Sequence, residues 1–341
     1  MAKNNFATSD NLTKKAWDEK LFRDVVKESY FAKFMNEKGD NIVHVKTQLE
    51  KSQGDKITFG LRMRGEFAGV TGNTVMEGNE NRLDFYNNSV SLELYRIAVR
   101  TGGALDKKRI MFSIDDEARE ALRESGTNKI EQLCFDTLFV DGTSTCYQTT
   151  ATNFLRNATA ATAKAALSAT NSLMTPSFIS ALKTFAKTGG ARGTVPLRPI
   201  KVNGKDYYVL LVHPDVIYDL KQNTVLQNAW RDAAERGSDN PLFRDAEVIW
   251  DGVCVHSNER VEIGTNAGGA SVPYSRAVLM GAQALVWAWG QRPETVTDTF
   301  DYENETGYCW NMMAGVLRSQ FNSADFGSIS VYCARTNVSG A

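Results

Sequence analysis

The clearest hydrophobic pattern along the chain lies between residues 197 and 243. Two apolar runs, Leu197–Val202 and Lys205–Val212, flank Asn203-Gly204. Asn-Gly predicts a tight hairpin here, because a type I′ turn needs positive φ at both central residues. The second run ends in Tyr207–Val212, which is apolar on both faces and is typical of a strand inside a covered sheet. We therefore expect this hairpin to form the rigid centre of a domain.

Helical patterns lie on either side of this hairpin. Pro214 suits the first turn of a helix, and the residue before Pro241 is driven out of the α region, which ends the pattern. Ile217 and Leu220 are expected to face inward, and the helix is expected to continue, with a break allowed, through Val225, Leu226 and Trp230. An earlier helix is predicted from Pro176 to Gly189-Gly190, with Thr175 as its cap.

Residues 113–139 are predicted to be helical in two pieces. Ser113 can cap the first piece, and the acidic triplet Asp115–Glu117 suits a positive helix N-terminus, so we interpret it as capping rather than metal binding. Gly126 marks either the end of that piece or a kink in one long helix. Residues 141–171 are rich in Thr, Ala, Ser and Asn, which predicts a surface connection with short ordered pieces.

The N-terminal region predicts an amphipathic helix over residues 13–35. Trp17, Leu21 and Val25 recur every four residues, with further aromatic residues beside them. So much apolar surface has to be buried, either on the helix's own domain or on a neighbouring subunit. The three residues are therefore candidate intersubunit contacts.

A long two-stranded ribbon is predicted next. Ile57–Arg64 forms one strand and residues 83–95 form the return path, around a glycine-rich stretch at 65–81. An isolated hairpin is marginal in water, so we expect the ribbon to rest on another surface. Glu77 and Glu80 in its tip are placed to meet Arg or Lys on a neighbouring subunit.

Strand-like runs dominate the rest of the chain. Two of them, Ala246–Val255 and Arg276–Trp289, follow the central hairpin and its helix. Three more alternate between apolar and polar residues, Val296–Tyr302, Tyr308–Phe321 and Ser328–Cys333. We expect these last three to close a second sheet.

Composition narrows the class of protein. A chain of 341 residues suits two lobes, and its net charge of −1 supplies no global basic field for nucleic acid. Five widely spaced cysteines without a C-x-x-C pair are typical of a reduced, intracellular chain. The polar start at residues 1–13 predicts no secretory signal, and the longest apolar run, Ala277–Trp289, is too short to cross a bilayer.

Candidate chemistry is sparse. The chain has no P-loop, dinucleotide-binding or nucleophile-elbow motif. His213 near Asp215 is the most catalytic-looking site, although helix capping is the favoured interpretation. Cys254 and His256 share a strand face, but zinc needs at least three protein ligands. We predict no catalytic, cofactor or metal site, and a cytoplasmic hydrolase or metal enzyme using His213, Asp215 and His256 stays an alternative.

A series of short motifs covers residues 54–284 in order. They are Gly54–Phe59, Gly69–Gly72, Glu77–Glu80, Arg96–Val99, Tyr207–Pro214, Asp219-Leu220, Asn240–Phe243 and Arg276–Ala284. Their order and spacing resemble the major capsid proteins of tailed bacteriophages with the Hong Kong 97-type fold. More narrowly, they are similar to the family typified by the capsid protein of coliphage N-four.

The resemblance implies an α+β fold with five segments. These are an N-terminal arm at 1–44, an extended E-loop hairpin at 45–96 that lies over an adjacent subunit, a P-domain with a spine helix at 97–175, an A-domain at 176–295, and C-terminal strands at 296–341 that return to the P-domain. A missing active site together with two unpaired elements suits such an assembly subunit.

The resemblance also implies the function and the partners. Copies would self-assemble as hexamers and pentamers into the icosahedral head of a tailed phage, in the host cytoplasm and without a membrane, and the chain would not be an enzyme. The partners implied are a portal protein and packaged double-stranded DNA, with a scaffold or decoration protein left open. A near-neutral wall retains DNA without binding it tightly. An encapsulin-type compartment shell, which shares the fold, stays a second alternative.

Overall fold

A computed structural model describes most of the chain. The described residues are 29–50, 54–62, 69–73, 75–80, 83, 85–110, 112–150, 153–156, 159–189, 196–202, 204–231, 247–265, 271–322 and 324–338. The chain divides into two compact units. The described parts of the first, which we call the helix–hairpin unit, are Tyr95–Lys129 and Pro293–Met312. The second, the sheet unit, contains Ser29–Leu94, Ile130–Arg292 and Met313–Ala341.

The sheet unit is built on a nine-stranded sheet in the order β10-β11-β9-β13-β18-β6-β7, with β12 paired to β13 and β8 to β9. Its strands are β6 (Thr145–Thr150), β7 (Asn153–Arg156), β8 (Ile200–Val202), β9 (Lys205–Val212), β10 (Val248–Trp250), β11 (Val253–Ser257), β12 (Ile263–Thr265), β13 (Pro273–Met280) and β18 (Ser328–Ala334). Strand β9 lies between parallel β11 and antiparallel β13, and Tyr208–Val212 is buried. The predicted central strand and its hairpin are therefore confirmed, since Val202 pairs with Lys205 across the turn.

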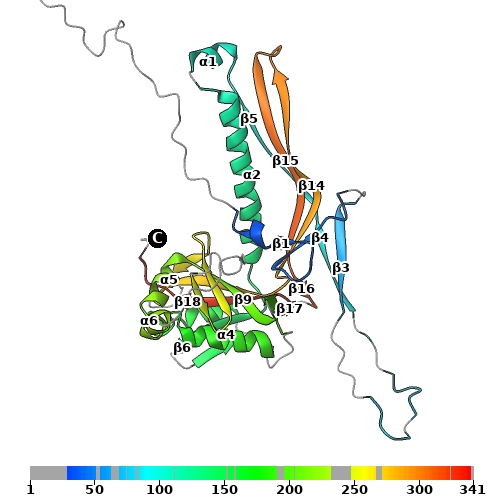
Figure 1. The fold of residues 1–341 in the computed structure, drawn as a ribbon, viewed down its shortest axis with the longest axis vertical. Helices are drawn as coiled ribbons and strands as arrows, with labels where there is room; N and C mark the ends of the chain where they lie inside the picture. Colours follow the sequence, from blue (N-terminus) through cyan, green and yellow to red (C-terminus); the bar gives the residue numbers. More distant parts are fainter. Residues whose placement is uncertain are drawn as a thin grey trace, which may run out of the picture. The chain divides into compact units, whose positions relative to one another are not determined.

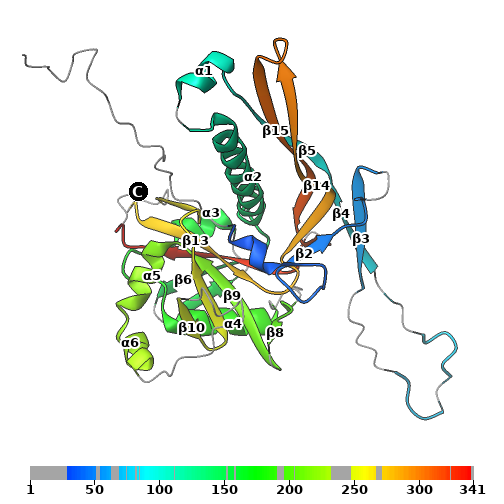
Figure 2. The same cartoon turned by 45° about the horizontal axis from the view of Figure 1, so that its top comes forward.

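Helices α3 (Ala160–Ala165), α4 (Pro176–Thr188), α5 (Pro214–Lys221) and α6 (Thr224–Arg231) belong to the same unit. Figures 1 and 2 show α4 and α5 beside the large sheet. As predicted, Thr175 caps α4 by accepting a hydrogen bond from the Phe178 amide at 3.2 Å. The helix after β9 also breaks as predicted, but Val225 on α6 is 56% exposed while Leu226 is buried. Ile217 and Leu220 are buried as predicted, and the side chain of Trp230 and the predicted stop at Pro241 lie outside the described residues.

Residues 141–171 do not form only a surface connection, which corrects that prediction. Strand β6 pairs in parallel with β18 inside the large sheet, and Cys146 and Tyr147 are buried. Helix α3 covers this strand, so that Ala163 and Leu167 pack against Tyr147. Small Thr and Ala side chains fit where a helix approaches a strand closely, and their low bulk had indicated a loop.

A five-stranded sheet has the order β1-β2-β14-β15-β5. Its strands are β1 (Met35–Asn36), β2 (Val43–Lys46), β5 (Glu93–Arg100), β14 (Leu285–Phe300) and β15 (Glu305–Arg318), and a small separate pair is formed by β16 (Gln320–Phe321) and β17 (Ala324–Asp325). Runs Val296–Tyr302 and Tyr308–Phe321 lie mainly in this second sheet, as predicted, whereas Ser328–Cys333 belongs to the nine-stranded sheet. The predicted run Arg276–Trp289 is broken at residues 281–284 between β13 and β14. A side chain at Gly281 would lie 2.5 Å from the Arg198 carbonyl, which explains glycine at this break.

The described part of the N-terminal region begins after the predicted helix's apolar stripe. Residues Phe31–Phe34 form a 3₁₀ turn, η1, and β1 follows, so the helix does not extend to residue 35 as expected. Phe31 is buried, with its ring centroid 5.2 Å from that of Phe135 in the same unit. Trp17, Leu21 and Val25 lie outside the described residues, and their role as intersubunit contacts stays a prediction.

Helices α1 (Ala104–Arg109) and α2 (Ile114–Leu138) are joined by a short connection. Ser113 caps α2 as predicted, by accepting a hydrogen bond from the Asp116 amide at 3.3 Å. The expected division into two pieces is wrong, because α2 runs without interruption through Gly126, and the alternative of one long helix is confirmed. No helix in the described ranges is long and apolar enough to cross a membrane.

Candidate functional site

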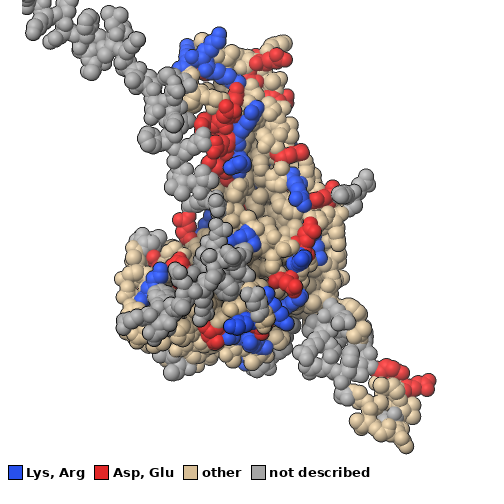
Figure 3. Space-filling view, viewed as in Figure 1, with Lys and Arg blue, Asp and Glu red and all other residues tan. Residues whose placement is uncertain are grey.

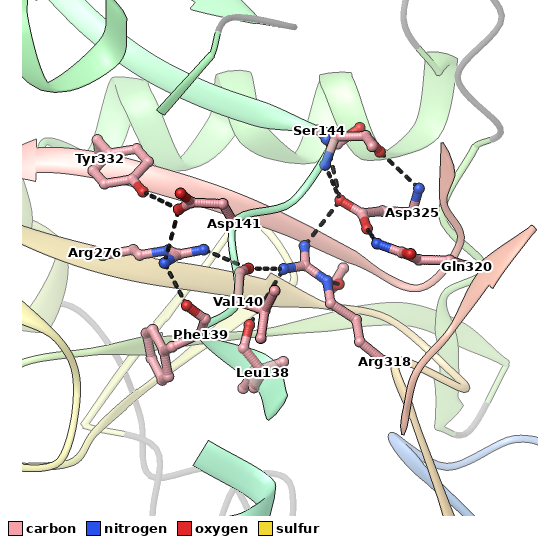
Figure 4. A network of polar contacts seen from close by, with 12 residues as sticks. Leu138, Phe139, Val140, Asp141, Ser144, Arg276, Arg318, Gln320, Asp325 and Tyr332 are labelled. Carbon is pink, nitrogen blue, oxygen red and sulfur yellow. Dashed lines mark hydrogen bonds and ion pairs between the residues drawn. The ribbon is translucent and has the colours of Figure 1, made fainter. Parts of the chain in front are cut away.

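A buried polar network in the sheet unit holds the last turn of α2 (Figure 4). Arg318 donates to the carbonyls of Leu138 at 3.3 Å and Val140 at 2.7 Å, and to the carboxylate of Asp325 at 3.0 Å. The Arg318 and Asp325 side chains are 4% and 0% exposed. Arginine here satisfies carbonyls that have no partner within the helix. Burial lowers the pKa of Arg318, and Asp325 opposes that shift.

A second buried arginine completes the same helix end. Arg276 on β13 donates to the carbonyls of Phe139 and Val140, and pairs with Asp141 at 3.2 Å and Glu262 at 3.0 Å. The two guanidinium groups thus bind the chain as it leaves α2 to strands β13, β15 and β18 of one unit. This is a structural site, because every donor named is directed at a backbone carbonyl or a carboxylate of the chain itself.

The predicted ribbon is a hairpin of β3 (Lys56–Arg62) and β4 (Phe85–Ser91), registered from Lys56–Ser91 to Arg62–Phe85. Its base is anchored, because Ile57 and Val90 are buried against Ala288 of β14. A side chain at Gly315 would lie 2.2 Å from the Ser91 carbonyl, so β15 and β4 approach more closely there than a larger residue allows. The ribbon therefore leaves the sheet unit from a fixed position.

The outer part of the ribbon is exposed and apolar. Val75 is 67% exposed, Met76 53% and Phe85 65%, and Leu83 is also exposed. A short turn orders this tip locally, because the Asn79 amide donates to the Met76 carbonyl at 2.9 Å. Several large apolar side chains exposed on one segment are typical of an interaction surface.

The two acidic residues of the tip differ in their surroundings. Glu80 accepts a hydrogen bond from the Gly78 amide at 2.8 Å and so helps to shape the turn. Glu77 is exposed, and within the described ranges no residue forms an ion pair with it. Whether either carboxylate meets Arg or Lys on another subunit stays a prediction.

The residues considered for catalysis have structural surroundings. His213 caps α5, with Nδ1 accepting from the Asp215 amide at 3.2 Å, as the capping interpretation predicts. Asp215 is held by buried Arg335, and the Thr336 amide donates to Asp219 at 2.8 Å, so this cluster fastens the chain after β18 to α5. His256 is fully buried, with its ring centroid 5.7 Å from that of Tyr30.

Metal ligation finds no support in this part of the molecule. Among the described residues, no group of three His, Cys, Asp or Glu side chains could hold a metal ion. Cys254 and His256 do lie on one strand, β11, but both are buried in packed surroundings.

The cap at His213 predicts a pH dependence of stability. Burial lowers the pKa of His213, with Arg335 acting in the same direction and Asp215 opposing. The unfolded chain, with an ordinary pKa of about 6.5, therefore binds the proton more readily than the folded one. The contribution is complete above that pH and is lost as the pH falls below it.

His213→Asn should reduce this acid sensitivity, because asparagine can still cap α5 but does not titrate. Urea unfolding at a series of pH values between neutrality and mild acid will measure it. We expect a smaller decrease in the free energy of unfolding for the variant than for the parent chain. Equal slopes would show that His213 does not titrate differently on folding.

The comparisons with known proteins agree with this geometry. A sequence profile of the phage capsid protein family matches residues 5–336. The major capsid protein of Pseudomonas phage KPP25 is 27% identical, over 97% of this chain and 97% of that protein. The capsid structure of Ralstonia phage GP4 has a TM-score of 0.80 at 25% identity and covers 99% of both chains. The capsid of cyanophage Pam1 has a TM-score of 0.80 at 23% identity, covering 99% of this chain and 100% of that chain.

The chain belongs to the phage capsid protein family. Its fold is the Hong Kong 97-type α+β fold of phage capsid proteins, as the resemblance implied. It is a phage major capsid protein, a structural subunit of the icosahedral shell of the virion and not an enzyme. The hydrolase, metal-enzyme and compartment-shell alternatives find no support.

Sequence reasoning missed the arginine network. Arg276 and Arg318 bond to carbonyls 136 to 180 positions away in the chain. The only local signal was an arginine inside each of two apolar strand runs. A charged residue at such a position is rarely buried unless it is paired, and that rule could have singled out both.

Proposed function

We propose that the β3–β4 hairpin is the E-loop with which each capsid subunit lies over a neighbouring copy. The observation that supports it is the exposed apolar tip, with Val75, Met76 and Phe85 each more than half exposed on a hairpin whose base is buried. Burying one such side chain contributes about 1.5–3 kcal/mol. In a shell built from copies of one chain, a neighbouring copy lies close to each subunit and can cover its exposed tip.

The segment boundaries belong to the same proposal. The N-terminal arm takes residues 1–44, the E-loop 45–96, the P-domain with α2 as spine helix 97–175, the A-domain 176–295 and the returning C-terminal strands 296–341. Helix α2, with 25 residues, suits a spine. The nine-stranded sheet with α4, α5 and α6 supplies most of the A-domain, although β6, β7 and β18 of that sheet fall outside its proposed limits.

Hexamers and pentamers of this chain, in our proposal, close the shell in the host cytoplasm around double-stranded DNA. A portal protein joins the shell. The proposal leaves open whether a scaffold or decoration protein takes part. The net charge of −1 suits a wall that contains DNA without tight phosphate contacts. To close a shell, each subunit must contact its neighbours through heterologous interfaces, and the rotation that relates the subunits must close into a ring.

Replacing residues 65–81 with Asn-Gly tests the E-loop. We expect a folded subunit with an unchanged unfolding midpoint that no longer makes stable shells, seen by electron microscopy and light scattering. Val75→Ser with Met76→Ser should weaken shells in the same direction, whereas Val225→Ser with Val338→Ser, equally exposed positions elsewhere, should not. Normal shells from the shortened chain would refute the proposal.

Glu77→Lys tests the charge of the tip, because Glu77 is a central residue of the local turn but its side chain forms none of the turn's hydrogen bonds among the described residues. Exposed ion pairs contribute only about 0–1 kcal/mol each, but identical contacts act together in a shell. We expect shells that dissociate at lower salt than the parent. Glu80→Gln, which retains an oxygen acceptor for the Gly78 amide, separates turn shape from charge.

A further inference from the structure

The turn between β14 and β15, in the helix–hairpin unit, has an uncommon backbone. Three consecutive residues that are not glycine, Asp301, Tyr302 and Glu303, have φ of 50°, 52° and 70°. The left-handed region is costly for such residues and is retained mainly where the surroundings impose it. Tyr302 is 103% exposed, as free of the protein as a tyrosine can be. We call residues 301–303 the hairpin tip.

The hairpin tip is rigidly held from below. The backbone N–H of Asn304 donates to the Asp301 carbonyl at 3.0 Å, and its side-chain Nδ2 donates to the Asp301 carboxylate at 3.2 Å. Its Oδ1 accepts from the Ala104 amide at 3.1 Å, which ties the turn to the start of α1. The Phe300 ring lies under the Arg100 guanidinium, 4.6 Å from its centroid. The strain is therefore stored in a preorganised turn that presents an aromatic side chain to solvent.

Helix α1, on the same unit, is basic where the hairpin tip is acidic. It has no buried residue, and Leu105 is 62% exposed. Its last turn holds Lys107, Lys108 and Arg109. Lys107 is engaged with Asp115 at 2.8 Å, while Lys108 forms no ion pair with any residue that the structure describes. Figure 3 shows basic side chains gathered over α1 and acidic ones at the end of the hairpin.

These two surfaces do not pair within one copy. Asn304 fixes the hairpin tip beside Ala104, at the start of α1, whereas Lys108 and Arg109 lie at its end. Lys107 Nζ donates to the Thr306 hydroxyl at 3.1 Å, so α1 contacts the hairpin below its tip, but among the described residues no ion pair joins Lys108 to the tip. No ion pair joins Glu303 to a described residue of α1. Lys108 and the acidic tip carry opposite charges and are not paired with each other in this copy, so each can pair with the other surface on a second copy.

We propose that the hairpin tip of one subunit docks on α1 of a second copy. Tyr302 packs on Leu105 and the stems of the basic residues, and Glu303 meets Lys108. A cation over an aromatic ring adds to this contact. Because the two surfaces differ, the contact is head-to-tail, and repeated rotation closes it into a ring. The proposal deepens the shell function but does not depend on the E-loop contact.

A crosslinking experiment tests proximity directly. Leu105→Cys with Tyr302→Cys is introduced into the full chain, and assembled shells are treated with a short bifunctional thiol reagent. We expect covalent multimers from the double variant and none from either single variant. Four of the five native cysteines are buried, and Cys309 is half-buried, so the single variants control for them. Shells without multimers would overturn the proposal.

A charge exchange tests the interaction and holds even if the cysteine variant assembles poorly. Glu303→Lys keeps an unbranched side chain at the same φ, so it adds no backbone strain. At low salt, Glu303→Lys or Lys108→Glu alone should raise the protein concentration needed for assembly by about threefold. The two together should restore it, while Arg123→Glu on exposed α2 should have no effect.

The outcomes separate the alternatives. Folded single variants with unchanged assembly, or a double variant no better than the singles, would overturn the pairing between copies. Assembly that needs an added phage protein, and recovers with it despite the single reversals, would assign the hairpin tip to that protein instead. Crosslinked multimers in a chain whose β3–β4 hairpin is dispensable would leave this inference standing while the E-loop proposal failed.

Discussion

Replacing Arg318 with methionine should lower the free energy of unfolding of the free subunit by about 3–5 kcal/mol, because it leaves Asp325 as an uncompensated buried charge. The Asp325 side chain is 0% exposed. The carbonyls of Leu138 and Val140 lose a donor at the same time. Methionine roughly preserves the volume of the stem, so the loss reports the charge and the hydrogen bonds rather than a cavity. Urea unfolding of unassembled subunits will measure it.

Two further variants show whether burial is the cause. Arg292 is an exposed arginine, 68% exposed, whose Nε lies 2.8 Å from Glu50. Arg292→Met should therefore cost only about 0–1 kcal/mol. Arg318→Met combined with Asp325→Leu removes both charges and should recover part of the loss, because a paired deletion leaves no isolated ion. Equal costs for Arg318→Met and Arg292→Met would contradict the burial argument.

Local signals explain which parts of the fold could be predicted. The Asn203-Gly204 turn, the Thr175 and Ser113 caps and the apolar faces of β9 all depend on residues a few positions apart. Each was placed correctly. Exposed apolar residues were harder, since Leu94 lies in the predicted return path of the ribbon but faces solvent. A pattern that equates apolar with buried fails at such positions.

The rest of the site depends on contacts between distant segments. The Asp325 carboxylate accepts from the Thr143 and Ser144 amides, 182 and 181 residues away, and no spacing rule reaches that far. Strand β6 was hidden for a related reason, because its cover, α3, is itself made of small residues. The hairpin tip was also missed, since Asp301–Glu303 has no glycine to indicate a left-handed turn.

Gly126 shows how packing overrides helix propensity. Sequence reasoning used this glycine to divide or kink a helix, yet α2 continues through it. An added Cβ would lie 2.4 Å from the Trp310 indole, so glycine is there to admit the ring of a residue on β15. Trp310 is buried, and no flexible end is available to move aside. The glycine therefore serves contact between α2 and β15 inside the helix–hairpin unit.

Gly126→Ala should accordingly destabilise the subunit, against the direction that propensity predicts. Alanine would gain about 0.5–1 kcal/mol in an exposed helix interior. Overpacking against a buried ring costs about 1–3 kcal/mol, so we expect a net loss in the free energy of unfolding. Ser125→Ala, at the adjacent exposed position, is the matched control and should be neutral or slightly stabilising.

Repeating Gly126→Ala in a chain that also carries Trp310→Phe tests whether the indole ring is what requires glycine at position 126. The three atoms nearest the added Cβ are Cε2, Nε1 and Cζ2 of the indole. Trp310→Phe removes the bulk of that part of the ring system. Alone it should destabilise by leaving a void, but in its presence Gly126→Ala should become neutral or stabilising. In this double-mutant cycle, the double variant should therefore be more stable than the sum of the two single-variant effects predicts. If alanine costs the same in both backgrounds, the ring is not what requires glycine at position 126, and the close approach of α2 and β15 would need another explanation.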